Sequence, residues 1–455
     1  MLLASEDAWA FDPLFTEPEV LETGKLLPGD TEVVKCPAHK EFSFPLTLGD
    51  AVDLGLCNNP QIKEAWAKIK VQTGVVGEAR AAYFPTLNGS VGNVFDRMIY
   101  PGSGVSGSTV NSWTVNGALS WRMLDFGGRG ANRLAANDLL RAALSGHDAI
   151  VQKTLTDLIQ AYFDAQTAKA VLNAKGQNEE IAQRTLDVAQ RREAKGAAAR
   201  SDTLQAATAL AKATLEKNRA KGAFLKAVAV LVYSMGVPSQ TPVILPDDLG
   251  EITGQEVADL GAFMADVQKN HPAIKASKAQ FEAAKHQVTV ARSESLPSLD
   301  FGANFYQNGR PGQSLPISNT EESTIGVTLN IPLFDGFTRI YKIREAKAQV
   351  EQKEAELQNV EYQTLMELVK AHADATSALQ NHQASDALLK SAQESLAVSQ
   401  RKYEKGAADI LEMLNTQSAL ADAQMEHIRC QAEWNSARLR LLASAGKMSR
   451  ASVDR

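Results

Sequence analysis

Side chains that commonly carry catalysis or bind metals are few in this chain of 455 residues, and they are widely spaced. Of its seven histidines, His372 and His382 are ten residues apart, about 80° from a common helix face. No cysteine or acidic pair completes a metal site with them. No His-Glu-x-x-His, Gly-x-Ser-x-Gly or phosphate-binding loop with lysine occurs. We therefore expect no metal, no cofactor and no enzyme activity.

Residues 102–107 fit the dinucleotide-binding pattern Gly-x-Gly-x-x-Gly letter for letter. That site needs a strand before the glycines and a helix after them, so that the helix N-terminus meets the pyrophosphate. Here a segment with strand periodicity follows instead. The pattern predicts a flexible loop and no nucleotide site.

Cys36 and Cys57 are 21 residues apart near the N-terminus, and Cys430 is the third cysteine. In an oxidising compartment the first two could form a disulfide that ties the N-terminal segment to the first helix. Two free buried thiols are the alternative. We expect the disulfide, with Cys430 left single on a helix.

The prolines indicate where long helices can form. None lies in 102–237 or in 333–455, and a proline inside a helix costs about 3 kcal/mol or more. Two very long helical tracts are therefore possible, which is unusual for a compact enzyme.

The net charge of -6 argues against nucleic acid as a partner. The chain contains no run of 18 or more apolar residues, so no transmembrane helix is predicted. The first ten residues do not make a complete signal peptide.

The chain is an internal duplication. Asn59-Pro60 recurs 212 residues later as His271-Pro272, and Lys195-Gly196-Ala-Ala recurs 210 residues later as Lys405-Gly406-Ala-Ala. Leu-Asp-Phe-Gly at 124–127 likewise matches Phe-Asp-Gly-Phe at 334–337. The register changes once, which places a two-residue length difference in a surface loop. The repeats predict one structural unit built twice.

Each repeat predicts a moderate helix, two amphipathic strands and a long helical hairpin. Apolar and polar residues alternate along 113–122, 324–331 and 299–305, and more weakly along 87–95. Gly/Ser/Pro-rich loops, 98–110 and 307–322, join the strands of each pair. The tract 132–193 is rich in good helix formers, and its counterpart has apolar residues at coiled-coil spacing. A soluble helical bundle or a filament would not explain the four strands.

Four strands cannot close a barrel, since about eight is the smallest common number. A soluble sheet would need cover for its large apolar residues and protection for its edges. A barrel built by two or three symmetric copies would instead turn the apolar face to lipid and the polar face to a wet lumen.

These elements and motifs together resemble the TolC-type outer-membrane channel family (outer membrane factors). The motifs are Asn-Pro, Ala-Arg and Phe-Pro-Thr-Leu within 59–87, Pro-Leu-Phe-Asp-Gly-Phe at 332–337, and Tyr-Glu-Lys-Gly-Ala-Ala-Asp-Ile-Leu-Glu-Met-Leu at 403–414. The resemblance covers about residues 46 to 446. It implies a mainly α fold with a small β part. Tandem-duplicated hairpins form a periplasmic α-barrel, and four strands per chain join a 12-stranded barrel of a homotrimer in the outer membrane.

The resemblance also implies partners: a periplasmic adaptor (membrane fusion protein), an inner-membrane ABC or proton-driven pump, and outer-membrane lipid. The channel would passively conduct type I secreted proteins or drugs. We expect 1–46 to be an extended periplasmic segment, 47–256 and 257–446 the two repeats, and 447–455 a tail. No lipid anchor is expected, because Cys36 lacks a small-residue acylation context.

The family's functional positions map onto the helix tips. The adaptor-contact residues implied at the two tips are Lys195, Gly196, Ala197, Lys405, Gly406 and Ala407. The pore-constriction residues implied just beyond them are Asp202, Gln205, Tyr403, Glu412 and Asn415. Three copies of a carboxylate around an axis would favour cations and could bind hard metal ions. Asn415 departs from the strongest acidic pattern, and Ala408 replaces an arginine that locks the closed state in some relatives. Solvated surface charges are the alternative interpretation.

The competing class of function is a periplasmic coiled-coil adaptor or structural protein without a pore. It predicts one helical hairpin beside a soluble β domain. The duplicated hairpins, each after a strand pair, favour the channel.

Overall fold

The computed structural model describes residue 14 and residues 45–247, 260–307, 320–446 and 448, except 103, 105 and 406. The chain folds into two compact units, which interleave along the sequence. Unit 1 contains 69–143 and 276–358, and unit 2 contains 22–68, 144–275 and 359–455. None of the helices in the described part combines the length and the apolar character that a membrane span needs.

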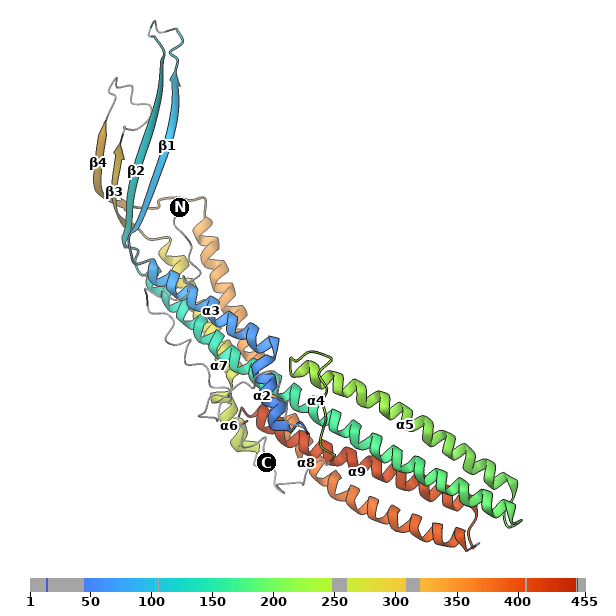
Figure 1. The fold of residues 1–455 in the computed structure, drawn as a ribbon. Helices are drawn as coiled ribbons and strands as arrows, with labels where there is room; N and C mark the ends of the chain where they lie inside the picture. The colour runs from blue at the N-terminus through green and yellow to red at the C-terminus, as the bar shows by residue number, and fades with distance from the viewer. Residues whose placement is uncertain are drawn as a thin grey trace. The chain divides into compact units, whose positions relative to one another are not determined.

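The same series of elements occurs twice along the chain (Figure 1). The first series is α2 (Leu48–Asn58), α3 (Pro60–Ala81), β1 (Thr86–Met98), β2 (Ser108–Leu124), α4 (Gly128–Ala194) and α5 (Arg200–Ser234). The second is α6 (Leu260–Asn270), α7 (Pro272–Ser293), β3 (Ser298–Gln307), β4 (Glu321–Asn330), α8 (Thr338–Glu404) and α9 (Ile410–Ser444). Corresponding helices have equal lengths of 11, 22, 67 and 35 residues. The predicted duplication and its long hairpins are confirmed.

Unit 1 contains an antiparallel sheet with the strand order β1-β2-β3-β4. The pairings Val91 with Val115 and Phe301 with Val327 place the predicted apolar positions of neighbouring strands opposite each other. Cross-strand partners point to the same side of a sheet, so the apolar residues form one continuous face. Leu87 and Ile325 on this face are 77% and 78% exposed in the single chain. A large apolar surface is therefore left without cover.

The opposite face of the sheet is polar. Arg122 on β2 pairs with Asp300 on β3 at 3.0 Å, and the side-chain amide of Asn330 on β4 donates to the same carboxylate at 2.8 Å. These contacts link three strands. Strand β2 begins five residues earlier than the predicted 113–122 because its pairing with β1 continues to Ser108.

The duplicated Asp-Phe-Gly and Asp-Gly-Phe motifs form the turns that lead into α4 and α8. The Asp125 carboxylate accepts from the backbone N–H of Arg129 at 2.7 Å, and Asp335 accepts from Arg339 at 3.0 Å. Phe126 adopts a φ of 51°, which only a constrained turn makes acceptable for a non-glycine residue. Each aspartate therefore satisfies a free N–H at the start of a long helix.

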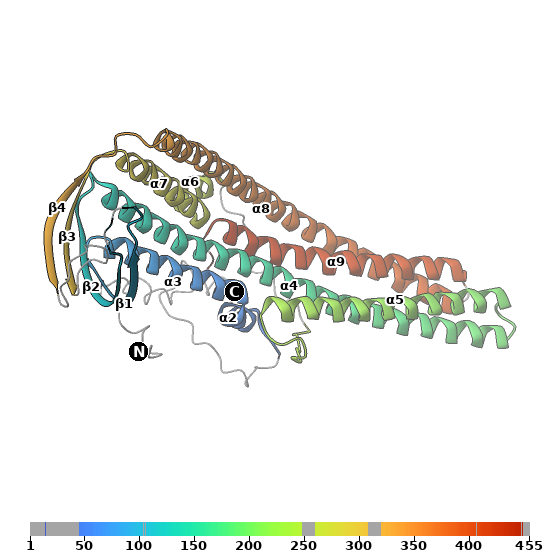
Figure 2. The same ribbon diagram turned by 90° about the horizontal axis from the view of Figure 1, so that it is seen from above.

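In unit 2 the helices of each hairpin run side by side, α4 with α5 and α8 with α9 (Figures 1 and 2). Two short helices that the sequence did not predict, α2 and α6, cover the ends of these hairpins. Helix α2 packs Val52 and its neighbours onto Leu158 and Leu231, whereas α6 contributes Phe263 and Val267 to a core around the fully buried Trp434. The N-terminus of α2 carries a capping box between Thr47 and Asp50.

Cys57 in α2 is disulfide-bonded, and Cys430 in α9 is a free, buried thiol. Cys36 lies outside the described residues, as does the predicted N-terminal segment 1–44 apart from residue 14. The pairing of Cys36 with Cys57 therefore stays a prediction.

Candidate helix-tip site

The turn between α4 and α5 is a helix C-cap centred on Gly196. Its backbone has a φ of 69°, the left-handed region that a glycine enters without steric cost. The N–H of Ala197 donates to the carbonyl of Arg192 at 2.8 Å, and the N–H of Gly196 donates to that of Glu193 at 2.9 Å. Together these bonds form a Schellman motif, which satisfies the last carbonyls of α4. Lys195, Gly196 and Ala197 are exposed.

The turn between α8 and α9 repeats this arrangement. The N–H of Ala407 donates to the carbonyl of Lys402 at 2.8 Å, which matches the Ala197 bond of the first tip. Gly406 lies outside the described residues. Asp409 caps α9 by accepting from the N–H of Glu412 at 2.7 Å. Lys405 and Ala407 are exposed, as Lys195 and Ala197 are at the first tip.

Arg192 joins the two tips of the chain. Its guanidinium, near the end of α4, donates to the backbone carbonyl of Tyr403 at 2.6 Å and lies 4.6 Å from the centre of the Tyr403 ring. A charged hydrogen bond and a cation–π contact therefore act on the same residue. The sequence did not single out Arg192, because the contact joins residues 211 positions apart.

Tyr403 is 2% exposed and packs with Ile410 and Met413 of α9. Burial raises the pKa of its hydroxyl, and the nearby Asp202 carboxylate raises it further, whereas Arg192 opposes the shift. The phenol is consequently neutral at physiological pH. Among the predicted constriction residues, Tyr403 and Asp202 are thus near enough to interact electrostatically.

The other predicted constriction residues lie within the first two turns of α5 and α9. Gln205, Glu412 and Asn415 are exposed in the single chain. Glu412 accepts from the Ser399 hydroxyl at 3.2 Å and faces the Lys402 ammonium at 3.5 Å. The carboxylate is therefore partly neutralised within its own hairpin, at a surface position where such a pair is weak.

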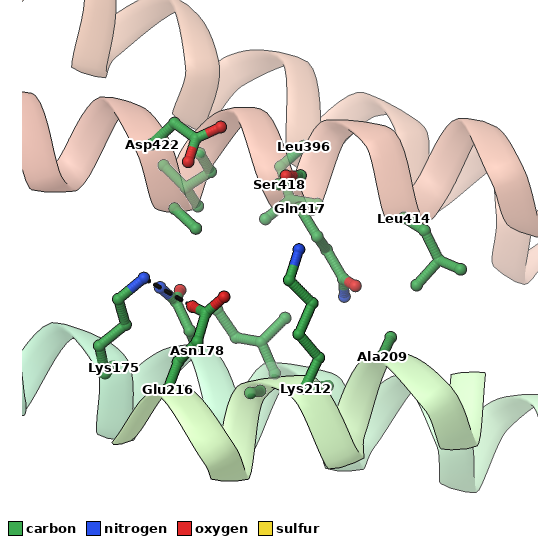
Figure 3. Close-up of a pocket in the computed structure, with 15 residues that line it drawn as sticks. Lys175, Asn178, Ala209, Lys212, Glu216, Leu396, Leu414, Gln417, Ser418 and Asp422 are labelled. Atoms are coloured by element: carbon green, nitrogen blue, oxygen red, sulfur yellow. Dashed lines mark hydrogen bonds and ion pairs between the residues drawn. The ribbon is translucent and has the colours of Figure 1, made fainter. Parts of the chain in front are cut away.

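A cavity of about 280 Å³ lies between the two hairpins (Figure 3). Lys175, Lys212 and Glu216 line it from the first hairpin, and Gln417 and Asp422 line it from the second. The side-chain amide of Gln417, which lines this cavity, also donates a hydrogen bond across the hairpins to the Thr185 hydroxyl at 2.6 Å. Arg192 and Gln417 thus hold the two hairpins together near the tips.

A sheet with an uncovered apolar face and two long helical hairpins defines the subunit of an outer-membrane channel-tunnel. The outer-membrane channel OprN has this fold, with a TM-score of 0.78 at 18% identity over 88% of this chain and 90% of that chain. Protein CyaE of Bordetella pertussis is 34% identical over 421 residues, which cover 92% of this chain and 88% of the relative. The alkaline protease secretion protein AprF of Pseudomonas aeruginosa is 22% identical over 436 residues, covering 91% and 87%.

A model of the outer membrane efflux protein family matches residues 51–237 and 264–447. The chain belongs to this family. It is a channel protein of the outer membrane that extends into the periplasm, and it acts as the outer-membrane component of tripartite export systems. The resemblance seen in the sequence motifs is therefore confirmed.

Proposed function

We propose that three copies of this chain form one channel-tunnel, which passively conducts substrates delivered by an inner-membrane pump and a periplasmic adaptor. The observation that carries the proposal is the sheet of unit 1, which has four strands and an exposed apolar face. One chain cannot close a barrel, but three copies supply twelve strands, an even number within the known range. Lipid would cover the apolar face, and the polar face around Arg122 would line the lumen.

In unit 2, the helix tips would meet the adaptor. The residues proposed for this contact are Lys195, Gly196, Ala197, Lys405, Gly406 and Ala407. Those that the structure describes are exposed and belong to rigidly capped turns. A turn held by Schellman bonds can dock without being ordered first, which lowers the entropic cost of binding.

Just beyond the tips, Asp202, Gln205, Tyr403, Glu412 and Asn415 would form the constriction. The Arg192 contact with Tyr403 supports this assignment, since it ties the two hairpins at the level of these residues. It also supplies an arginine near Tyr403 although position 408 is an alanine. Opening the channel would require this contact to yield.

The cargo would be selected by the pump and adaptor, which would also supply the energy, so this chain would perform no catalytic step. A protease secretion protein and an outer membrane efflux protein are both among its relatives. Type I secreted proteins and drugs are accordingly the two cargo classes.

We also keep two structural proposals: repeats at 47–256 and 257–446, and a Cys36–Cys57 disulfide. The disulfide is testable by mass spectrometry of non-reduced peptides.

The decisive experiment combines mass and conductance. Protein purified in detergent should have the mass of three chains by light scattering and should produce discrete ion-conducting steps in planar bilayers. A monomer that remains in solution without detergent, or a trimer that conducts no ions, would contradict the proposal.

A further inference from the structure

We propose that the second hairpin contains a divalent transition-metal site formed by His382 and Asp386 of α8 and His427 of α9. One ligand atom from each of these side chains lies within 4.8 Å of the others. The sequence alone predicted no metal site, because histidine spacing was compared along a single helix. The structure brings together residues from two antiparallel helices that are more than forty positions apart.

The distances fit coordination with small side-chain movements. Nδ1 of His427 lies 3.1 Å from Oδ1 of Asp386, and Nε2 of His382 lies 3.7 Å from Oδ2. Bonds of about 2.0–2.1 Å to a tetrahedral zinc ion place its ligand atoms roughly 3.3 Å apart. The centres of the two imidazole rings lie 5.6 Å apart.

The donor set indicates which ion would bind. Two imidazoles and one carboxylate are typical ligands of zinc, with a fourth position left for water. The side chains of His382 and His427 are 13% and 23% exposed, whereas that of Asp386 is 57% exposed. The imidazoles are thus held in place by the hairpin, and the carboxylate side leaves an entry path for the ion.

Ser385 and Cys430 lie beside the site. The Ser385 hydroxyl donates to the His382 carbonyl at 2.7 Å and lies 3.4 Å from Nδ1 of His427. Cys430, one turn beyond His427, is buried and does not belong to the group of close ligand atoms. We therefore assign three protein ligands and exclude the thiol.

A comparison with the first repeat indicates what a bound ion would do in the second hairpin. At the positions 210 residues earlier the first repeat has Leu172, Gly176 and Lys217, which cannot bind such an ion. Its hairpin is instead tied at this level by two ion pairs between α4 and α5, Lys175–Glu216 and Lys217–Glu179, each at 2.7 Å. The Lys175 ammonium lowers the pKa of the Glu216 carboxyl. The metal would replace these ionic links in the second hairpin and clamp α8 to α9.

The test uses full-length protein in detergent without a histidine tag, stripped with chelator and titrated with Zn²⁺. Elemental analysis should find one zinc per chain, and competition with a chromophoric chelator should give its affinity. His427→Gln and Asp386→Asn should each weaken binding at least tenfold. Zn²⁺ should raise the melting temperature of the native protein but not of His427→Gln. Asp386→Asn guards against misfolding, because it changes an exposed side chain isosterically.

Two matched variants make the assignment specific. His372→Gln, earlier on α8, and Cys430→Ser should both bind Zn²⁺ as the native protein does. Co²⁺ in place of zinc should give tetrahedral absorption bands without a thiolate charge-transfer band. No retained zinc in the native protein, or an equal loss in His372→Gln or Cys430→Ser, would overturn the proposal.

Discussion

Arg192 is the residue through which the two hairpins of one chain are connected at their tips. We predict that Arg192→Ala weakens this connection by about 2 kcal/mol, because it removes a charged hydrogen bond and a cation–π contact with Tyr403 together. Single channels in planar bilayers should then show a larger mean conductance, since the proposed constriction would be held less firmly.

The neighbouring Arg191 provides the control for this substitution. It is exposed, and its guanidinium donates to the Asp187 carbonyl of its own helix at 3.1 Å. Arg191→Ala should leave the conductance unchanged while removing the same charge. If Arg191→Ala and Arg192→Ala raise the mean conductance equally, the lost charge and not the contact with Tyr403 controls the tip.

Glu412 tests the constriction from the electrostatic side. In a ring of three copies, Glu412→Gln should lower the preference for cations several-fold and weaken block by divalent ions. Reversal potentials in asymmetric salt measure this preference. Lys402 already shields the carboxylate in part, so low ionic strength should show the effect best. Glu394→Gln, a charge-matched change at an exposed position higher on α8, should have no effect; an equal loss of selectivity there would return Glu412 to an ordinary surface charge.

At the scale of elements, the helical hairpins depend on caps that are local in sequence. Gly196→Ala forces a side chain into a left-handed backbone, although open space surrounds its Cβ position. We predict a loss of about 1–2 kcal/mol in stability, measurable by chemical denaturation, together with weaker adaptor binding.

Gly176→Ala is the matched control in the same helix. Its Cβ would also meet open space, but its backbone is helical, so alanine should stabilise it by about 0.5–1 kcal/mol. The two glycine variants should therefore change stability in opposite directions. A similar loss in both would show that a methyl group anywhere on α4 is harmful and that the cap is not special.

Elements with local signals were predictable from the sequence. Strict alternation of side chains predicted the strands, and a proline-free tract of good helix formers predicted α4 to within a few residues at each end and a second long helix in the other repeat. The Lys-Gly-Ala-Ala pattern predicted the tip turn because glycine provides its left-handed backbone.

The remaining features depend on contacts between distant residues. Helices α2 and α6 are short, and their stability comes from packing onto the hairpins around Leu158 and Trp434. The Arg192–Tyr403 contact and the His382–Asp386–His427 cluster join helices through the fold. His382 and Asp386 do have the i,i+4 spacing of one helix face, but nothing along the chain links them to His427 or links Arg192 to Tyr403, so only the paired hairpins reveal these contacts.

At the scale of the whole molecule, the two faces of the sheet determine how copies must assemble. Within one chain the described sheet begins with β1 and ends with β4, and each of these strands has one edge free to pair. Pairing β4 of one copy with β1 of the next would satisfy those backbone groups in lipid, where an open edge is not tolerated. The apolar face would then form the continuous outer belt.

Adjacent residues of β4 allow this arrangement to be tested. Ile325 pairs with Ala303 on the apolar face, and Thr324 pairs with Asn304 on the polar face. Ile325→Lys should cost about 2–4 kcal/mol per chain near the bilayer centre, so the yield of membrane-inserted trimer on a semi-native gel should fall sharply. Thr324→Lys introduces the same charge into a wet lumen and should preserve the trimer while making conductance less cation-selective. Equal tolerance of both lysines would mean that this face does not meet lipid, and equal loss of both trimers would mean that the strand tolerates no charge on either side.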